Sequence, residues 1–186
     1  MEPVIYLVVL AVIVIALICL YVSLYNGIVS ARNRCDNAWQ TIDTQLQRRN
    51  DLIPNLVETV KGYASHESNT LEEVTKARGA LNAARTPQEK MEASNMLTNT
   101  LTHLFAVAES YPDLKANTNF QQLQSELSDT EDKISYARMS YNDCVLTYNN
   151  AITTFPGNIV AGSKFTPRTG FEVTNEAART APSVRF

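Results

Sequence analysis

An uninterrupted apolar run at the N-terminus limits what this chain can fold into more than any other feature. The run reads PVIYLVVLAVIVIALICLYVSLYNGIVSA, and no charged residue lies between Glu2 and Arg32. Residues 4–24 alone would form a helix roughly 31 Å long, which matches a bilayer hydrocarbon core of roughly 30 Å. Tyr6 and Tyr25 lie near its two ends, as aromatic residues do at membrane interfaces. The run therefore predicts a transmembrane helix over residues 4–24, in contact with the lipid bilayer.

A cleaved signal peptide is the alternative interpretation of this run. Such a peptide has a basic start, a shorter apolar segment and small residues before the cleavage site. Here the chain begins Met-Glu-Pro, and no A-x-A pattern follows the run. A lipoprotein site is also poorly matched, because the bulky Ile18 precedes Cys19. We therefore expect the helix to be retained as a membrane anchor.

The charges beside the run predict its orientation. Arg32 and Arg34 follow it closely, and no Lys or Arg precedes it. The positive-inside rule then predicts a single-pass protein of the cell (inner) membrane, with the N-terminus outside and the C-terminal body in the cytoplasm. Cys35 and Cys144 are compatible with that reducing compartment.

The residues after the run keep a helical period. Alternate steps of four and three residues reach eleven positions, nine of them apolar or aromatic. These positions are Ile28, Arg32, Cys35, Trp39, Ile42, Leu46, Arg49, Ile53, Leu56, Val60 and Tyr63. A second stripe of the same period runs from Phe120 to Phe155, where the sequence FPG is expected to end the helix.

Two shorter helices are expected between these stripes. Residues 65–85 carry a weak apolar face, and residues after Thr86 carry a stronger one. In TPQE, Thr86 would be the N-cap, Pro87 the first helical residue and Glu89 the partner in a capping box. Residues 109–119 read as a connection, with Thr118 or Asn119 as the next cap. The chain is thus predicted to be all-α: a transmembrane helix followed by an antiparallel bundle of three to four long helices.

Pro54 and Arg49 are the two irregular residues of the first stripe. Since the stripe keeps its phase across Pro54, the sequence predicts a bend in a continuous helix, with the Asn50 carbonyl freed from its usual bond. For Arg49 two interpretations stay open. Its stem could pack while its head reaches water, which we weigh slightly higher. Alternatively, it could pair with an acidic residue of the last helix.

Composition and motifs point away from catalysis. The net charge is −3, and the sequence has no basic region typical of a nucleic-acid site. No GxG pair is present for a dinucleotide or phosphate loop, and neither His66 nor His103 lies in a metal-binding motif. We expect no catalytic residue, no cofactor site and no metal site.

Longer stretches make the chain similar to a known family. YNGIVSARNRCDNAWQTIDTQLQRRNDLIPNLVETVKGYASHE, AESYPDLKANTNFQQLQ, ISYARMSYNDCVLTYNNAITTFP and GFEVTNEAARTAPSVRF resemble LemA family proteins over about residues 25–186. Cys35 and Asp36 are the main departures. The resemblance implies a LemA-like four-helix bundle behind an N-terminal anchor, and it brings no enzymatic activity or cofactor with it.

The resemblance also changes the interpretation of the C-terminal tail. Residues 156–186 have the composition of a linker, but their recurring phenylalanines are expected to lie along the bundle. The expected organisation is then an anchor over 1–24, a bundle over 25–155 and a packed tail over 156–186. The candidate structural or interaction residues are Trp39, Arg49, Pro54, Tyr141, Tyr148, Phe171 and Phe186.

These observations favour a non-catalytic, membrane-anchored helical module that scaffolds or self-assembles. Its expected partners are further copies of the chain or a membrane protein, with no nucleic acid. The alternative is an accessory subunit or an enzyme whose site is not visible in the sequence.

Overall fold

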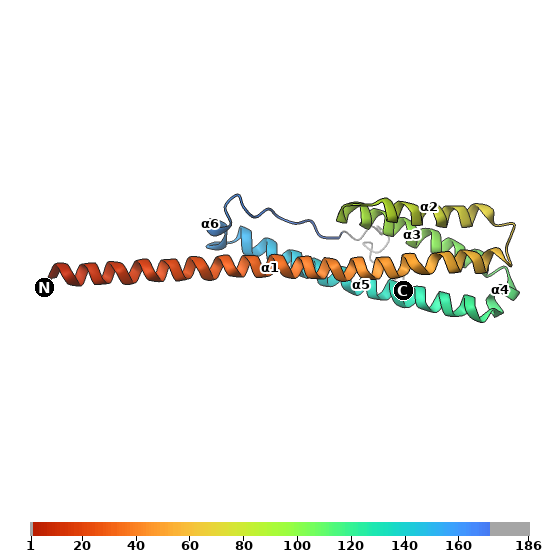
Figure 1. Cartoon of the computed structure of the whole chain (residues 1–186), viewed down its shortest axis with the longest axis horizontal. Coiled ribbons are helices and arrows are strands. Elements are labelled where there is room, and N and C mark those ends of the chain that lie inside the picture. Colours follow the sequence, from red (N-terminus) through yellow and green to blue (C-terminus); the bar gives the residue numbers. More distant parts are fainter. Residues whose placement is uncertain (1, 172–186) are drawn as a thin grey trace, which may run out of the picture. The chain divides into compact units, whose positions relative to one another are not determined.

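Helices make up most of the described part of the chain (Figure 1). The computed structural model of the protein describes residues 2–171. Its helices are α1 (Glu2–Lys61), α2 (Ser68–Ala83), α3 (Pro87–Ala108), α4 (Pro112–Ala116), α5 (Thr118–Thr153) and α6 (Gly157–Ala161). Residues 2–171 contain no strand. The predicted all-α fold with an apolar N-terminal helix is confirmed.

Helix α1 is a single helix of 60 residues that begins in the apolar run. By length and composition this helix can cross a membrane. Its most apolar stretch of 18 residues is not buried within the structure. The helix also continues through Pro54, as the unbroken phase of the stripe predicted. Packing of an amphipathic face outweighs the cost of a proline in a helix interior, which is about 3 kcal/mol in a free helix.

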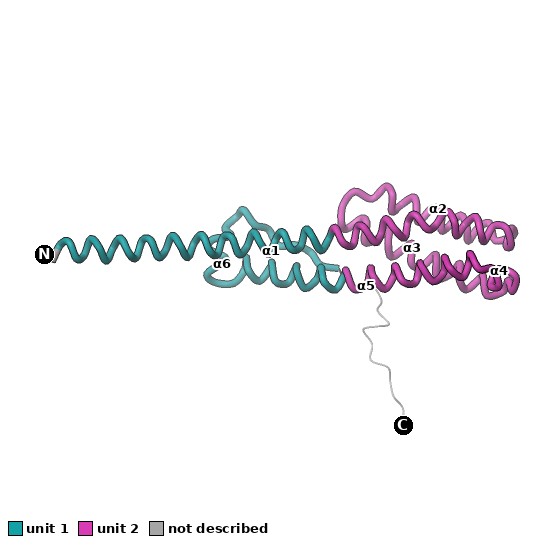
Figure 2. The backbone as a smooth tube through the Cα atoms, turned by 60° about the horizontal axis from the view of Figure 1, so that its bottom comes forward, with its two compact units in different colours: residues 1–39, 138–186 teal, residues 40–137 magenta. Residues whose placement is uncertain are grey.

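The chain divides into two compact units, coloured separately in Figure 2. Unit 1 contains the residues up to Trp39 and those from Arg138 onward, and unit 2 contains Gln40–Ala137. Helices α1 and α5 each contribute residues to both units.

Unit 2 is built from the later part of α1, from α2, α3 and α4, and from the first part of α5. Helices α2 and α3 pack side by side in both views (Figures 1 and 2). The apolar stripes expected from the sequence supply the core. Its buried residues include Ile42, Leu46, Ile53, Leu56, Val60, Leu71, Val74, Ala77, Leu81, Leu97, Leu101, Leu104, Phe120, Leu127 and Ile134.

Local capping explains where two of the helices begin. At α3, Glu89 N–H donates to the Thr86 hydroxyl (3.2 Å), and the Glu89 carboxylate accepts from Thr86 N–H (3.1 Å). The predicted capping box is thus confirmed, and the backbone donors of Arg85 and Thr86 lower the pKa of Glu89. The predicted cap of α5 was wrong. The Asn117 side chain accepts from Phe120 N–H (3.0 Å), because the short α4 ends just before it.

Unit 1 shows where the second stripe departs from its prediction. Phe155 was expected on the buried face but lies beyond the end of α5 at Thr153 and is 79% exposed. Within α5, Val145 and Ile152 are buried although they lie off the predicted stripe. An α-helix has 3.6 residues per turn, so it drifts by about 20° per heptad against a strict 3.5 repeat. Towards the end of α5 this drift turns Val145 and Ile152 inward, each one residue after a position of the predicted stripe.

Candidate functional site

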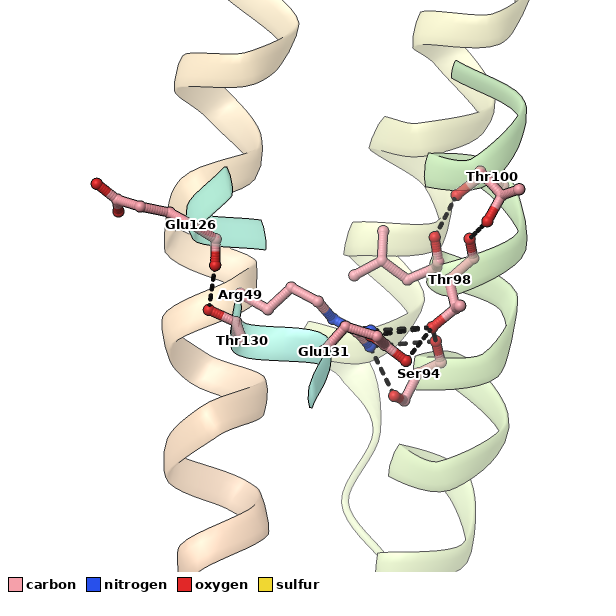
Figure 3. A network of polar contacts seen from close by, with 9 residues as sticks. Arg49, Ser94, Thr98, Thr100, Glu126, Thr130 and Glu131 are labelled. Carbon is pink, nitrogen blue, oxygen red and sulfur yellow. Dashed lines mark hydrogen bonds and ion pairs between the residues drawn. The ribbon is translucent and has the colours of Figure 1, made fainter. Parts of the chain in front are cut away.

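Arg49 forms the centre of a polar network inside unit 2 (Figure 3). The side chain is 1% exposed and extends from α1. Its Nη1 forms an ion pair with Glu131 of α5 and donates to Thr98 Oγ1 of α3 (2.9 Å). Its Nη2 donates to the Ser94 hydroxyl (2.6 Å) and to the Ser94 carbonyl (3.1 Å), also in α3. One guanidinium on α1 thus binds groups from two other helices, α3 and α5.

This geometry decides between the two interpretations of Arg49. The expectation that its head reaches water was wrong, because the guanidinium is enclosed and its charge is matched by Glu131. The Glu131 side chain is 39% exposed, so the pair is open to water on one side only. Thr98 Oγ1 also donates to Glu131 (3.3 Å), which holds the carboxylate in place. Because the planar guanidinium donates to several acceptors in fixed directions, it restricts how α1, α3 and α5 can pack.

The carbonyl freed by Pro54 has a partner in the same unit. Proline has no N–H, so the Asn50 carbonyl four residues earlier loses its helical donor. Arg78 Nε of α2 donates to this carbonyl at 3.3 Å. The proline therefore exposes an acceptor through which α2 binds α1.

A cavity of about 550 Å³ lies next to the Arg49 network. Its size is typical of pockets for small molecules. Apolar side chains from α3 and α5 form part of its wall, and amide, hydroxyl and charged groups form the rest. The lining residues are Arg49, Thr98, Leu101, Thr102, Phe105, Gln121, Gln124, Ser125, Leu127, Ser128 and Glu131. Chemically, this arrangement suits a molecule with an apolar body and a few hydrogen-bonding groups.

Three of the predicted interaction residues meet in an aromatic cluster in unit 1. The ring of Trp39 lies 5.9 Å from that of Tyr141 and 6.0 Å from that of Phe171. The rings of Tyr141 and Phe171 are 5.4 Å apart and meet edge to face. The Arg138 guanidinium lies 5.3 Å from the centre of the Phe171 ring. Trp39 is half-buried, and burial raises the pKa of Tyr141, so the cluster is part of the core.

The side-chain amides of α5 hold the segment that contains Phe171. Asn142 accepts from Phe171 N–H (2.7 Å) and donates to the Phe171 carbonyl (3.1 Å). Asn149 makes the same pair of bonds to Arg168, at 2.9 Å and 2.8 Å. Seven residues of helix advance about 10.5 Å, and three residues of extended chain advance about 10 Å. The two spacings match, so each asparagine pairs with the backbone as a neighbouring strand would.

Tyr148 and Arg168 add further contacts to this segment. The Tyr148 hydroxyl donates to the Thr166 carbonyl (3.1 Å), and the Arg168 guanidinium lies 5.7 Å from the centre of the Tyr148 ring. Arg168 also pairs with Asp36 of α1 (2.7 Å). Burial alone would lower the pKa of Arg168, but the ion pair with Asp36, together with smaller contributions from Cys35 and Tyr141, raises the pKa. Residues 166–171 therefore bind both α1 and α5.

Sequence reasoning found the aromatic members of this arrangement and missed its polar ones. Asn142 and Asn149 are the missed residues, and their heptad spacing on one face of α5 was the available signal. The predicted candidate Phe186 lies outside the described residues.

We expect Asn142→Ala to release Phe171 without unfolding α5. The change removes a donor and an acceptor to the backbone, and a net hydrogen bond contributes about 1 kcal/mol. Amide exchange of Phe171 should accelerate, while exchange in the middle of α5 should stay unchanged, as measured by hydrogen–deuterium exchange of the full chain. Asn150→Ala, at an exposed position of the same helix, is the matched control. Equal acceleration in both variants would contradict the role given to Asn142.

Reactive side chains are not gathered into a site in the described residues. Within residues 2–171, no group of three or more His, Cys, Asp and Glu residues could hold a metal ion. His103 lies near Glu73 (3.8 Å) with both side chains largely exposed. The Cys35 thiol is buried, and burial raises its pKa, so it stays protonated at neutral pH.

Comparisons with known proteins agree on one relationship. The model of the LemA family matches residues 38–186. Protein LemA of Metamycoplasma hominis is 30% identical over 145 residues, which cover 76% of this chain and 65% of that protein. Magnetosome protein MamQ 2 of Paramagnetospirillum magneticum is 27% identical over 174 residues, covering 80% of this chain and 64% of the relative. Magnetosome protein MamQ of Magnetospirillum gryphiswaldense is 26% identical over 181 residues, covering 82% and 66%. The chain thus spans about two thirds of the length of these relatives.

Proposed function

The chain belongs to the LemA family, and from this premise we propose that it is a non-catalytic helical module, anchored in a membrane, that organises copies of itself or other membrane proteins. The observation that carries this proposal is the continuity of α1. Within unit 1 the helix passes directly from its apolar segment to the buried residues Ile28 and Cys35. Because the apolar segment and these core residues belong to one unbroken helix, unit 1 would be held at the bilayer surface.

The polar groups of the interior support a structural role. Arg49 and Glu131 bind each other and the neighbouring hydroxyl groups, as a network that determines helix packing would. The Asn142 and Asn149 amides bind the protein's own backbone. Three of the relatives carry the name magnetosome protein, which refers to a cellular structure and not to a reaction.

The cavity beside Arg49 favours one alternative, an accessory subunit or enzyme that binds a small molecule. Native mass spectrometry of the detergent-extracted full chain separates the two functions. Under our proposal the masses correspond to copies of the chain or to protein partners. A stoichiometric small molecule that is lost in Ser128→Trp, which fills the cavity, would support the alternative instead.

The anchor is proposed to cross the membrane once, with the N-terminus outside and the body in the cytoplasm. Arg32 and Arg34 on the body side support this orientation. Protease added to intact cells that express a C-terminally tagged chain should leave the tag in place, and opening the inner membrane should allow its removal. The control is a chain with the same C-terminal tag and a basic extension at its N-terminus, so that Lys or Arg residues also precede the span. Loss of the tag of the unaltered chain without opening the membrane would contradict this orientation.

The identity of the partner is tested by cross-linking after extraction from the membrane. Gentle detergent extraction followed by cross-linking mass spectrometry should give contacts between copies of the chain or with one recurring membrane protein. A monomer without cross-links to any protein would contradict the organising role.

A further inference from the structure

The corner between α5 and α6 presents large apolar side chains to solvent. This corner, defined as residues 155–164, joins the end of α5 to the extended segment. Phe155 is 79% exposed and Ile159 is 71% exposed. On the same short helix, Val160 and Ala161 are buried. The corner is therefore packed onto unit 1 while its most apolar residues remain outside.

Contacts with α1 place this corner at the end of the apolar segment. Leu24 and Gly27 of α1 line a cavity of about 420 Å³ together with Phe155 and Gly157. The ring of Tyr25 meets that of Phe165 edge to face, with 5.7 Å between centres. In Figure 1, α6 lies beside α1. Gly27 follows the predicted end of the transmembrane segment by three residues, which is about 4.5 Å along a helix and within the depth of the lipid headgroups.

The backbone holds the corner close to α5. A Cβ atom on Gly157 would overlap the Ala151 carbonyl oxygen, so only glycine fits this approach. The exposed side chains of Phe155 and Ile159 are consequently carried on a well-packed turn, not on a free loop.

The charges around the corner match an anionic lipid surface. No Asp or Glu occurs between residues 3 and 35 or between residues 144 and 171. Arg34 lines the same cavity as the corner, and Arg32 and Lys164 are exposed. Apolar side chains combined with nearby Lys and Arg are typical of segments that lie in the interface of anionic bilayers.

From this juxtaposition we propose that the α5–α6 corner is a second membrane contact, at which Phe155 and Ile159 insert into the interface of the bilayer that α1 enters. The proposal rests on the membrane anchoring proposed above. The bilayer is the occupant because the corner adjoins the end of the apolar segment and lacks acidic residues. The corner and α1 would then hold unit 1 to the membrane at two points.

Quenching by brominated phospholipids tests this contact in the full chain. Phe155→Trp is reconstituted in phosphatidylcholine–phosphatidylglycerol vesicles whose acyl chains carry bromine near the headgroup. Native Trp39 contributes the same background fluorescence to every variant. This background is measured in the unaltered chain and subtracted. Met139→Trp is the matched control, because Met139 is also exposed but lies on α5, 14 residues before the end of that helix at Thr153, about 21 Å along the helix. We expect the brominated lipid to quench most of the fluorescence that the tryptophan at position 155 adds. It should quench little of the fluorescence added at position 139.

Further variants separate the possible failures. Ile13→Trp lies near the middle of the apolar segment, and its quenching in matching vesicles whose acyl chains carry bromine near their methyl ends shows that α1 is inserted. If position 13 is quenched while positions 155 and 139 are quenched equally weakly, the corner contact is wrong and the anchor stands. If position 13 is not quenched, the anchor itself is wrong.

Two more readouts complete the test. Lys164→Glu in the Phe155→Trp chain should reduce quenching in vesicles with phosphatidylglycerol and leave it unchanged in pure phosphatidylcholine. The second readout is the emission wavelength of the tryptophan introduced at position 155. A shift of that emission to longer wavelength on dilution of the protein, without any quenching by brominated lipid, would identify a second copy as the occupant and would overturn the proposal.

Discussion

Glu131→Leu is expected to lower the free energy of unfolding by about 3 kcal/mol, because it leaves the guanidinium of Arg49 buried without its carboxylate. Removing one partner of a buried ion pair costs roughly 3–5 kcal/mol. The partial exposure of Glu131 places this change at the lower end of that range. Urea unfolding of the full chain in mild detergent, followed by circular dichroism, measures the effect. Asp132→Leu, at the exposed next position, is the matched control and should change stability little.

The double variant Arg49→Met with Glu131→Leu shows whether the cost comes from the unpaired charge. An apolar pair of similar volume avoids the desolvation of both charges, so much of the lost stability should return. Arg49→Met alone should cost less than Glu131→Leu, because the remaining carboxylate is partly in water. If the losses of the two single variants simply add in the double variant, the ion pair is not what couples α1 to α5.

Tyr141→Ala is expected to destabilise the protein by about 3–5 kcal/mol, the range for truncating a large aromatic side chain in a core. Tyr141 is 6% exposed and meets the rings of Trp39 and Phe171, so its removal opens a cavity between two helices and the tail segment. The matched control lies on the same helix. Tyr136 is 72% exposed, and Tyr136→Ala should cost little.

The comparison of the two tyrosines can be made in one denaturation series. Trp39 fluorescence reports the cluster directly, since its ring contacts both Tyr141 and Phe171. Equal losses of stability for Tyr141→Ala and Tyr136→Ala would mean that the buried face of α5 is wrongly assigned.

The sequence predicted the helices because its local signals agree with one another. The capping box at Thr86 and Glu89 depends on neighbouring residues, so it could be identified before the fold was known. Burial of Leu71, Val74, Ala77 and Leu81 in α2 followed from helical spacing alone. The same reasoning failed at Phe155, because α5 ends at Thr153 and the chain turns before this residue.

By itself, the sequence determined where the four long helices lie, that α1 runs through Pro54, and which face of α2, of α3 and of most of α5 is buried. The short helices α4 and α6 were not predicted. These properties depend on residues a few positions apart in one chain segment. Only the tertiary structure decided that Arg49 pairs with Glu131, that Arg78 binds the Asn50 carbonyl, and that Asn142 holds Phe171. Each of these contacts joins residues 28 or more positions apart, and the partner depends on which helices or segments become neighbours and in what register. A hydrophobic repeat shows that a position faces inward. The hydrogen-bond partner of a polar group at that position depends on which side chains the neighbouring element places beside it.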